Sequence, residues 1–372
     1  MEELKMNTGS RSTIEVGGLE VTFQRTVRVP AGKRNSLPAG LGSFPMYRVS
    51  DYKSGCPDNW RPDGFFFPIY RQEAMWINFG RTTGNEPRAL IVGAGNINAI
   101  SGKPFDPSKN KLEGTAREDG ALGQVSSLDV RLDDKQNYIA VPPQRWIDGW
   151  KGPDGKVYQF VAAEMGSGET VEAQITGEET VGGIQLIVYT PKAGQHLIPV
   201  SRPRPFIESS GFEGYLNLGS LGYGGFHDGG AMRSLGGSVM RGGDSFSLGL
   251  KSFSASPARS MGLGMGGEID QKIYPDPYGL TVWNDAPEAV DLVYMVSSQD
   301  FQQITGQAAP PTPVTYARCQ ELGLPWFEVH DGKLGDAPGS KVFVDLKPVG
   351  EGKGPVLDKL KPYDPHPVKK GE

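Results

Sequence analysis

The serine best suited to nucleophilic chemistry is Ser260, in the sequence Ala258-Arg-Ser-Met-Gly262. The spacing is similar to a nucleophile elbow, in which a serine lies on a sharp turn between a strand and a helix of an esterase-type hydrolase. Here glycine, serine and proline flank the motif on both sides, and none of the four histidines lies in a recognisable motif. A chance match in a Ser- and Gly-rich segment explains the same residues, so Ser260 is a catalytic candidate without an identified base.

A second pattern, at residues 89–98, is typical of the start of a dinucleotide-binding turn. An apolar run is followed by Gly93-Ala-Gly95, but Asn98 stands at the position of the third glycine. In the dinucleotide-binding pattern that third glycine allows the following helix to pack closely on the strand. Pro104 and Pro107 leave no room for that helix. We therefore predict a strand that ends in a glycine turn, and no bound cofactor.

Metal-binding residues are few and scattered. The histidines form no His-x-x-x-His pair, and Cys56 and Cys319 lie far apart in the sequence. Acidic neighbours such as Asp133-Asp134 are expected to be solvated turns. The sequence predicts no metal site, and a disulfide between the two cysteines stays open.

Tryptophans beside predicted loops form the first candidate binding surface. Trp146 and Trp150 lead into a Pro153-Asp-Gly155 turn, and Trp326 and Phe327 follow the last predicted helix. Aromatic side chains offer a large contact area at a low cost in conformational entropy, so they suit sugars or a partner protein. The alternative is that they close the ends of a β-structure as part of its core.

A glycine-rich interval, residues 211–267, carries the second candidate surface. Glycine at this density costs backbone entropy on folding, so we expect the chain either to leave the interval mobile or to use it where backbones pass close together. Flexible thioethers suit a surface that moulds to a partner, and the alternative is a loop that docks loosely on its own body. The residues concerned are Met232, Met240, Phe246, Met261 and Met265.

Short β-type runs separated by turn residues occupy most of the chain before this interval. Leu19, Val21 and Phe23 alternate with polar residues, as in a sheet with one buried face, and Gly17-Gly18 separates this run from residues 14–16. The spacing of the runs predicts a mainly β fold with a β-sandwich or barrel-like body. Further strands are expected at residues 74–79, 89–92, 125–132, 138–141, 157–163, 170–176, 183–189, 269–274, 278–283 and 289–296.

Two short helices are predicted near the C-terminal end of the body. Ser297-Ser-Gln-Asp300 is similar to a capping box, and Gly306 stands where a terminating glycine is expected. The second helix has Thr312 as its N-cap, Pro313 in its first turn, and Gly323 as its terminator.

These elements divide the chain into four parts. Residues 13–200 form a β-rich body, residues 201–268 a long Gly-, Met- and Ser-rich insertion, and residues 269–346 returning strands and the two helices. We expect the third part to pack on the same body as the first, and a separate second domain is the alternative. Residues 347–372, rich in Lys, Pro and Gly, are expected to form a disordered tail.

Charge and hydropathy narrow the classes of partner. The net charge of −5 is spread over mixed acidic and basic residues, which argues against a nucleic-acid-binding surface. No run approaches the roughly 18 apolar residues of a membrane-spanning helix, and the first residues lack the apolar core of a signal peptide. The sequence therefore predicts a cytoplasmic protein without a membrane span, and leaves open export by a route that needs no signal peptide.

Several segments resemble a family of uncharacterised bacterial and fungal proteins. The resemblance covers most of residues 20–327, which implies one compact unit, and it supplies no catalytic residues. Members are sometimes labelled integral membrane proteins, a label that the lack of an apolar spanning run in this sequence contradicts. The segments that carry the resemblance begin at Leu37-Pro-Ala-Gly, Arg71-Gln-Glu-Ala-Met-Trp76, Gln159-Phe-Val-Ala-Ala, Gly166-Ser-Gly-Glu-Thr-Val, Gly182-Gly-Ile-Gln-Leu, Gln271-Lys-Ile-Tyr-Pro-Asp-Pro-Tyr278 and Gly323-Leu-Pro-Trp-Phe327.

No motif identifies a reaction, so the sequence favours a non-enzymatic structural or interaction protein. It would self-assemble, or bind a protein or glycan partner, through the Gly-rich insertion and the tryptophan-bearing loops. The alternatives are a hydrolase acting on sugars or esters, and a small-molecule carrier that binds near Trp146 and Trp150.

Overall fold

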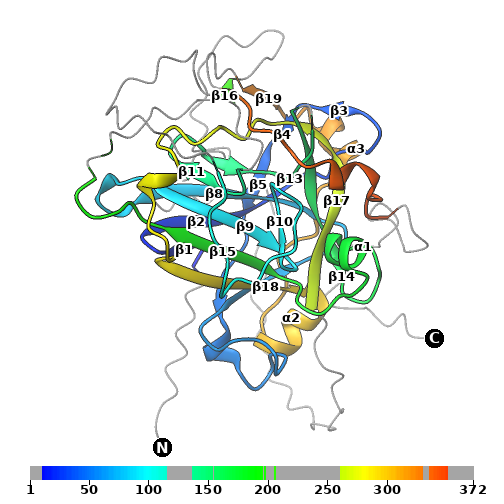
Figure 1. Ribbon diagram of the computed structural model, residues 1–372. Coiled ribbons are helices and arrows are strands. Elements are labelled where there is room, and N and C mark those ends of the chain that lie inside the picture. Colours follow the sequence, from blue (N-terminus) through cyan, green and yellow to red (C-terminus); the bar gives the residue numbers. More distant parts are fainter. Residues whose placement is uncertain are drawn as a thin grey trace, which may run out of the picture.

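The computed structural model describes residues 11–114, 136–153, 155–195, 197, 205–206, 260–329 and 335–350. These residues form a mainly β structure with a large, mostly antiparallel sheet and few helices, which confirms the mainly β part of the predicted fold class (Figure 1). The predicted strand at residues 125–132 and most of the Gly-rich interval lie outside the described residues.

The strands are between two and eleven residues long. In chain order they are β1 (Thr13–Val16), β2 (Leu19–Thr26), β3 (Arg34–Asn35), β4 (Leu37–Pro38), β5 (Gly40–Ser43), β6 (Tyr47–Arg48), β7 (Phe65–Ile69), β8 (Ala74–Thr82), β9 (Arg88–Ala94), β10 (Ile97–Asn98), β11 (Ile139–Val141), β12 (Trp146–Ile147), β13 (Gly149–Lys151), β14 (Lys156–Glu164), β15 (Ile184–Tyr189), β16 (Pro205–Phe206), β17 (Ser260–Asp270), β18 (Ala289–Ser297) and β19 (Trp326–Val329). The helices are α1 (Val171–Thr176), α2 (Ser298–Thr305) and α3 (Tyr316–Glu321), and single 3-10 turns are η1 (Val49–Tyr52), η2 (Thr83–Asn85), η4 (Leu280–Val282) and η5 (Lys341–Asp345).

The large sheet follows one hydrogen-bonded path, β1-β2-β8-β14-β17-β18-β15-β9-β10. Its pairs are antiparallel except for β3 on β17 and β7 on β18. Among the described strands no pairing joins β1 to β10, so the path stays open. A second, small sheet has the order β16-β19-β4.

Turns predicted from glycine are present where expected. Gly17 and Gly18 both have positive φ between β1 and β2, and Gly155 has φ 72° between β13 and β14. On β2, Leu19, Val21 and Phe23 are all buried completely, as the alternation predicted. Local sequence therefore determines these hairpins.

β17 contains the last part of the Gly-rich interval and lies in the middle of the large sheet. Met261 and Met265 point into the main core, whereas Gly262 and Gly264 lie on the opposite face of the strand. A Cβ on Gly264 would lie 2.5 Å from the backbone oxygen of Glu169. Here glycine serves the close approach of backbones, one of the two uses expected, and residues 260–268, predicted as the end of the insertion, belong to β17.

The segment after β17, residues 271–276, runs through the interior, and it belongs to no strand among the described residues. Glutamine side chains take the place of the missing strand. Gln144 accepts a hydrogen bond from the Tyr274 N–H at 3.0 Å and donates to the carbonyls of Lys272 (3.2 Å) and Trp146 (2.9 Å). Gln136 accepts from the Asp276 N–H at 2.9 Å in the same way. Each amide supplies hydrogen-bond partners to buried backbone groups.

The helices carry clear capping signals. Ser297 caps α2 by accepting from the Asp300 N–H, and Gly306 ends the helix with φ 70°, as predicted. The cap of α3 is Thr315 and not Thr312, because the Pro-rich residues before Thr315 stay outside the helix. Residues 170–176, expected as a strand, form α1 between a Thr170 cap and a left-handed Gly177.

Three further expectations differ from the structure. The strand predicted at 278–283 is the 3-10 turn η4, and the strand predicted at 269–274 ends with β17 at Asp270. Residues 347–350, expected as the start of a disordered tail, dock on the body, and residues 351–372 lie outside the described residues.

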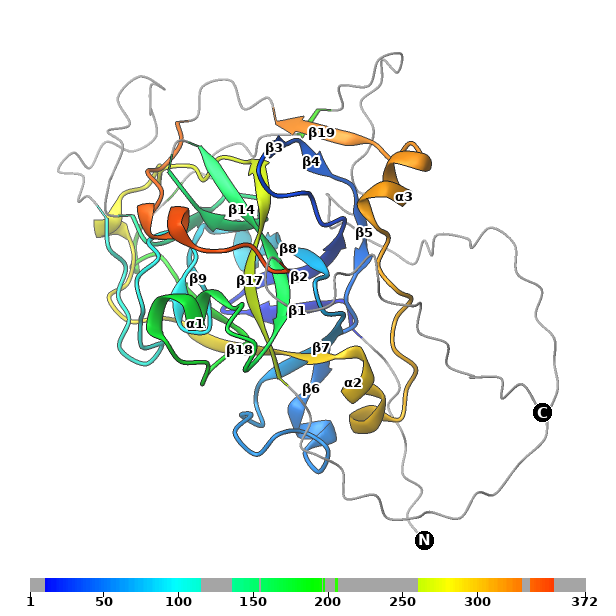
Figure 2. The same ribbon diagram turned by 90° about the vertical axis from the view of Figure 1, so that its right-hand side faces the viewer.

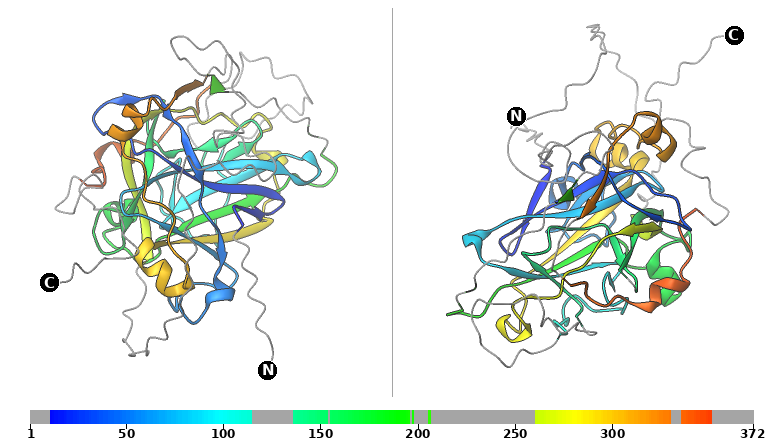
Figure 3. Two further views of the ribbon diagram at one scale, coloured as in Figure 1. Left: turned by 180° about the vertical axis from the view of Figure 1, so that it is seen from behind. Right: turned by 90° about the horizontal axis from the view of Figure 1, so that it is seen from above.

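The helix α2 lies at the opposite end of the large sheet from the small sheet and the helix α3. β3, β4, β19 and α3 gather at one end, and β6, η1 and α2 lie at the other (Figure 2). Seen from behind, α3 (orange) lies beside the blue N-terminal strands (Figure 3). β17 runs between these ends, because Ser260 pairs with β18 and Glu268 pairs with β3.

Candidate functional site

The first candidate surface, around Trp146 and Trp150, is part of the core. Trp146 is 4% exposed and donates its indole N–H to Asp148 Oδ2 at 2.6 Å. Trp150 is fully buried, donates to the Gly264 carbonyl at 3.2 Å, and packs edge-on against Phe160. Neither ring is available to a sugar or partner on the surface, so the alternative reading, core packing, describes both residues.

Trp326 and Phe327 differ from each other. Phe327 is buried beneath the small sheet. Trp326 is half-buried and packs against Tyr316 with 5.5 Å between ring centroids. Lys33 lies over the Tyr316 ring at 5.3 Å. Of the predicted aromatic surface in the described residues, Trp326 alone keeps part of its ring exposed.

The predicted methionine surface is divided in the same way. Met261 and Met265 are buried in the core with at most 1% exposure, because they alternate with glycines on β17. Met232, Met240 and Phe246 lie outside the described residues.

Ser260, the nucleophile candidate, is the first residue of β17. Its Oγ accepts a hydrogen bond from the Trp60 indole N–H at 3.1 Å, and the Trp60 ring stacks on Tyr294 with centroids 4.6 Å apart. A nucleophile elbow requires a strand before the serine and a helix after it, whereas here the strand follows. The four histidines lie outside the described residues. The geometry therefore assigns Ser260 a positioning contact with Trp60.

The Gly93–Gly95 pattern forms a two-residue hairpin between β9 and β10. Gly95 and Asn96 both have φ 56°, the conformation of a type I′ turn. The predicted strand with a glycine turn is confirmed.

Both cysteines are buried free thiols. Burial raises the pKa of Cys56 to about 11 and also raises the pKa of Cys319, so both remain protonated at neutral pH. In the part of the chain that the structure describes, no group of three or more His, Cys, Asp or Glu side chains could hold a metal ion.

Ionisable side chains in the core join distant segments. Glu73 accepts from Arg25 Nε at 2.6 Å, and Lys151 donates to both oxygens of Asp336 at 2.7 and 2.6 Å. Burial raises the pKa of Glu73 and lowers the pKa of Lys151, and in each case the partner opposes the shift. These pairs are satisfied internally, which is typical of a structural role.

Asp148 differs from these pairs. It is fully buried between β12 and β13, and its Oδ1 has no hydrogen-bond partner among the described residues. Burial raises its pKa to about 7, although the Trp146 hydrogen bond acts in the opposite direction. The carboxyl group is a proton-binding site without solvent contact.

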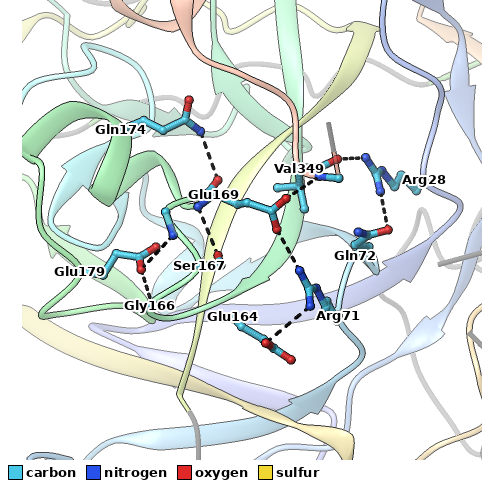
Figure 4. A network of polar contacts seen from close by, with 12 residues as sticks. Arg28, Arg71, Gln72, Glu164, Gly166, Ser167, Glu169, Gln174, Glu179 and Val349 are labelled. Carbon is cyan, nitrogen blue, oxygen red and sulfur yellow. Dashed lines mark hydrogen bonds and ion pairs between the residues drawn. The ribbon is translucent and has the colours of Figure 1, made fainter. Parts of the chain in front are cut away.

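A polar cluster that the sequence did not predict surrounds residues 347–350 (Figure 4). Arg71 lies between two carboxylates, 3.3 Å from Glu169 Oε2 and 3.6 Å from Glu164 Oε2. Glu169 uses its other oxygen to accept from the Gly350 N–H at 3.0 Å. Arg71 thereby positions the carboxylate that holds the backbone of the docked residues.

A second pair in this cluster acts on the neighbouring residue. Arg28 donates to the Val349 carbonyl and, at 3.1 Å, to Gln72 Oε1. Gln174, on α1, accepts from the Lys347 N–H at 2.7 Å and donates to the Lys347 carbonyl at 3.1 Å. The cluster brings the turn before β8, the helix α1 and residues 347–350 into contact. No local sequence signal connects these three segments.

None of the helices in the described ranges is long and apolar enough to cross a bilayer. The chain matches no model of a known protein family, no curated protein and no solved structure in the comparisons.

Proposed function

We propose that this chain is a non-enzymatic interaction protein that self-assembles, or binds a protein partner, through residues 207–259. In this proposal the β-rich body, which we expect to be a sandwich or barrel-like unit, is the support. Met232, Met240 and Phe246 are the contact residues. The burial of Trp146 and Trp150 disfavours a glycan partner, which would need exposed aromatic rings.

The observation that carries the proposal is how the two flanks of this segment are held. Phe206 precedes it in β16, which pairs with β19 in the small sheet. Ser260 follows it at the end of β17 that lies away from the small sheet. β17 is 11 residues long, which corresponds to about 35 Å at ~3.3 Å per residue. A segment tied to the body at two distant points loses less conformational entropy when a partner orders it than a free chain end would.

The test replaces residues 212–257 by a Gly/Ser sequence of equal length. Equal length keeps the loop-closure entropy of the body unchanged, so folding and association are measured separately. We expect the far-ultraviolet circular dichroism and the fluorescence of the buried tryptophans to stay as in the parent protein, and the association to be lost. Association is read from the mass by light scattering over a concentration series.

A matched pair of triple variants narrows the test to side chains. Met232→Ser, Met240→Ser and Phe246→Ser together should reduce association at least tenfold. The control triple variant removes three apolar side chains on the surface of the body and should leave association unchanged. It carries Leu322→Ser, Val342→Ser and Val344→Ser, at residues that are 50, 44 and 52% exposed. Equal loss in both triples, or in neither, would contradict the proposed contact residues.

A further inference from the structure

We call residues 347–350 the docked segment. They lie against the edge of β17 in the way that a bound peptide lies against the edge of a strand. One edge of β17 pairs with β14 along almost its whole length. The other edge is closed by short pieces: β18 at Ser260 and Met261, Thr170 at Gly264, and β3 at Glu268 and Ile269. The docked segment fills the place at Met265, whose carbonyl accepts from the Val349 N–H at 2.8 Å. Adding an extended segment to a sheet edge is a common mode of peptide recognition.

Most hydrogen bonds between the body and the main chain of the docked segment come from side chains of the body. Gln174 binds the backbone N–H and the carbonyl of Lys347. Glu169 accepts from the Gly350 N–H, and Arg28 donates to the Val349 carbonyl. Pro348 has no N–H, so every backbone donor of the segment has a partner. Polar groups placed in this way recognise an extended backbone of defined length.

One side chain of the docked segment enters an apolar socket. Val349 is fully buried against Ala74, Val161 and Ala163. The socket exists because Gly264 has no side chain: a Cβ there would lie 2.3 Å from Val349 Cγ2. The glycine run of β17 therefore creates the space that Val349 fills.

The geometry also defines which peptide fits. Position 349 takes a small branched side chain, and position 350 has φ 87°, which favours glycine. Lys347 is exposed, so its side chain adds no requirement. The matching ligand is an extended peptide that contains Pro-Val-Gly.

We propose that the acceptor groove, formed by Arg28, Ala74, Val161, Ala163, Glu169, Gln174 and Gly264, is a peptide-binding site that a second copy of this chain can fill with its own residues 347–350. The occupant in the structure is this same sequence, so every contact can be repeated between copies, as in exchange of an identical element. The tethered segment competes at an effective concentration on the order of millimolar, so exchange requires that one copy's own segment be displaced. The inference goes beyond the proposed function, because it uses no residue of 207–259.

The experiment is a complementation between two variants, both carrying the Gly/Ser replacement of residues 212–257. That background removes association through the Gly-rich interval, so failure of the proposed function leaves this test intact. The first variant carries Val349→Asp and keeps the groove. The second carries Glu169→Ala and Gln174→Ala and keeps the segment. Each alone should stay near the single-chain mass of about 40 kDa, and a mixture at 0.1–1 mM, in the range of ~mM effective concentrations, should contain a species of twice that mass.

A synthetic peptide of residues 345–352 gives an independent readout. It should raise the thermal midpoint of the full-length Val349→Asp variant, and the same peptide with Val349→Asp should bind at least tenfold more weakly. If Val349→Asp does not fold, full-length Val349→Ala takes its place in the peptide measurement. A folded variant that neither peptide stabilises, together with an unchanged mass in the mixture, would overturn the acceptor groove.

Discussion

At the scale of single residues, Asp148 is the group whose chemistry departs most from its ordinary behaviour. The folded protein binds a proton at this carboxyl up to about pH 7, whereas the unfolded chain loses that proton near the ordinary pKa of 3.8. Between these values the folded state holds the proton and the unfolded state does not. The contribution of Asp148 to the free energy of unfolding therefore falls as the pH rises from about 4 to about 7, and stays constant above that range.

Asp148→Asn removes this titration while keeping an oxygen that can accept from the Trp146 indole. We expect the thermal midpoint of the variant to exceed that of the parent protein by an amount that grows from pH 4 to pH 7. At pH 7 the difference corresponds to a gain in the free energy of unfolding on the order of 4 kcal/mol. The comparison is thermal unfolding of both proteins from pH 4 to pH 8. Asp106→Asn serves as the control, because Asp106 is exposed and its hydrogen bonds to Ser108 lower its pKa. A parent and an Asp148→Asn protein whose midpoints differ by the same amount at every pH would refute the assignment.

At the scale of elements, side-chain amides replace a missing strand along residues 271–276. Gln144→Leu keeps the volume but leaves the Tyr274 N–H and the Lys272 carbonyl buried without this partner. Unfolding in urea should show a loss of about 2–4 kcal/mol. Gln299→Leu makes the same change at an exposed position of α2 and should stay within about 0.5 kcal/mol of the parent. A Gln144→Leu protein as stable as Gln299→Leu would show that residues 271–276 do not depend on this amide.

The elements that the sequence predicted correctly are those with local signals. The Gly17-Gly18 and Gly95-Asn96 hairpins and the capped helix α2 depend on residues within one or two turns of each other. The prediction of a strand at residues 170–176 was wrong, because Val171, Ala173 and Ile175 alternate with other residues as in a strand. The helix prevails because Glu172 accepts hydrogen bonds from the N–H groups of Thr180, Val181 and Gly182, which hold the helix against the following loop.

The candidate sites were predicted less well, for a physical reason. Aromatic composition predicts contact area but not on which side of a strand it lies, so Trp146 and Trp150 could not be assigned to core or surface. The acceptor groove depends on Ala74, Glu169 and Gly264, which come together only in the folded chain. The glycine run of residues 261–267 was the one sequence signal of this close approach.

At the scale of the whole molecule, a β-rich body holds the two flanks of residues 207–259. The body uses its tryptophans, its two methionines on β17 and its buried ion pairs for its own packing. We propose that contacts with other molecules involve Met232, Met240 and Phe246, and exchange at the acceptor groove. The resemblance to bacterial and fungal proteins stays a prediction at this scale.

The measurement that tests this division most directly is the solution mass of the unmodified protein by light scattering across a dilution series. Self-assembly through residues 207–259 predicts a mass that climbs with concentration above 40.1 kDa towards dimers or larger species, and that returns to the single-chain value in the Met232→Ser, Met240→Ser, Phe246→Ser triple variant. A mass of 40.1 kDa at every concentration would contradict self-assembly.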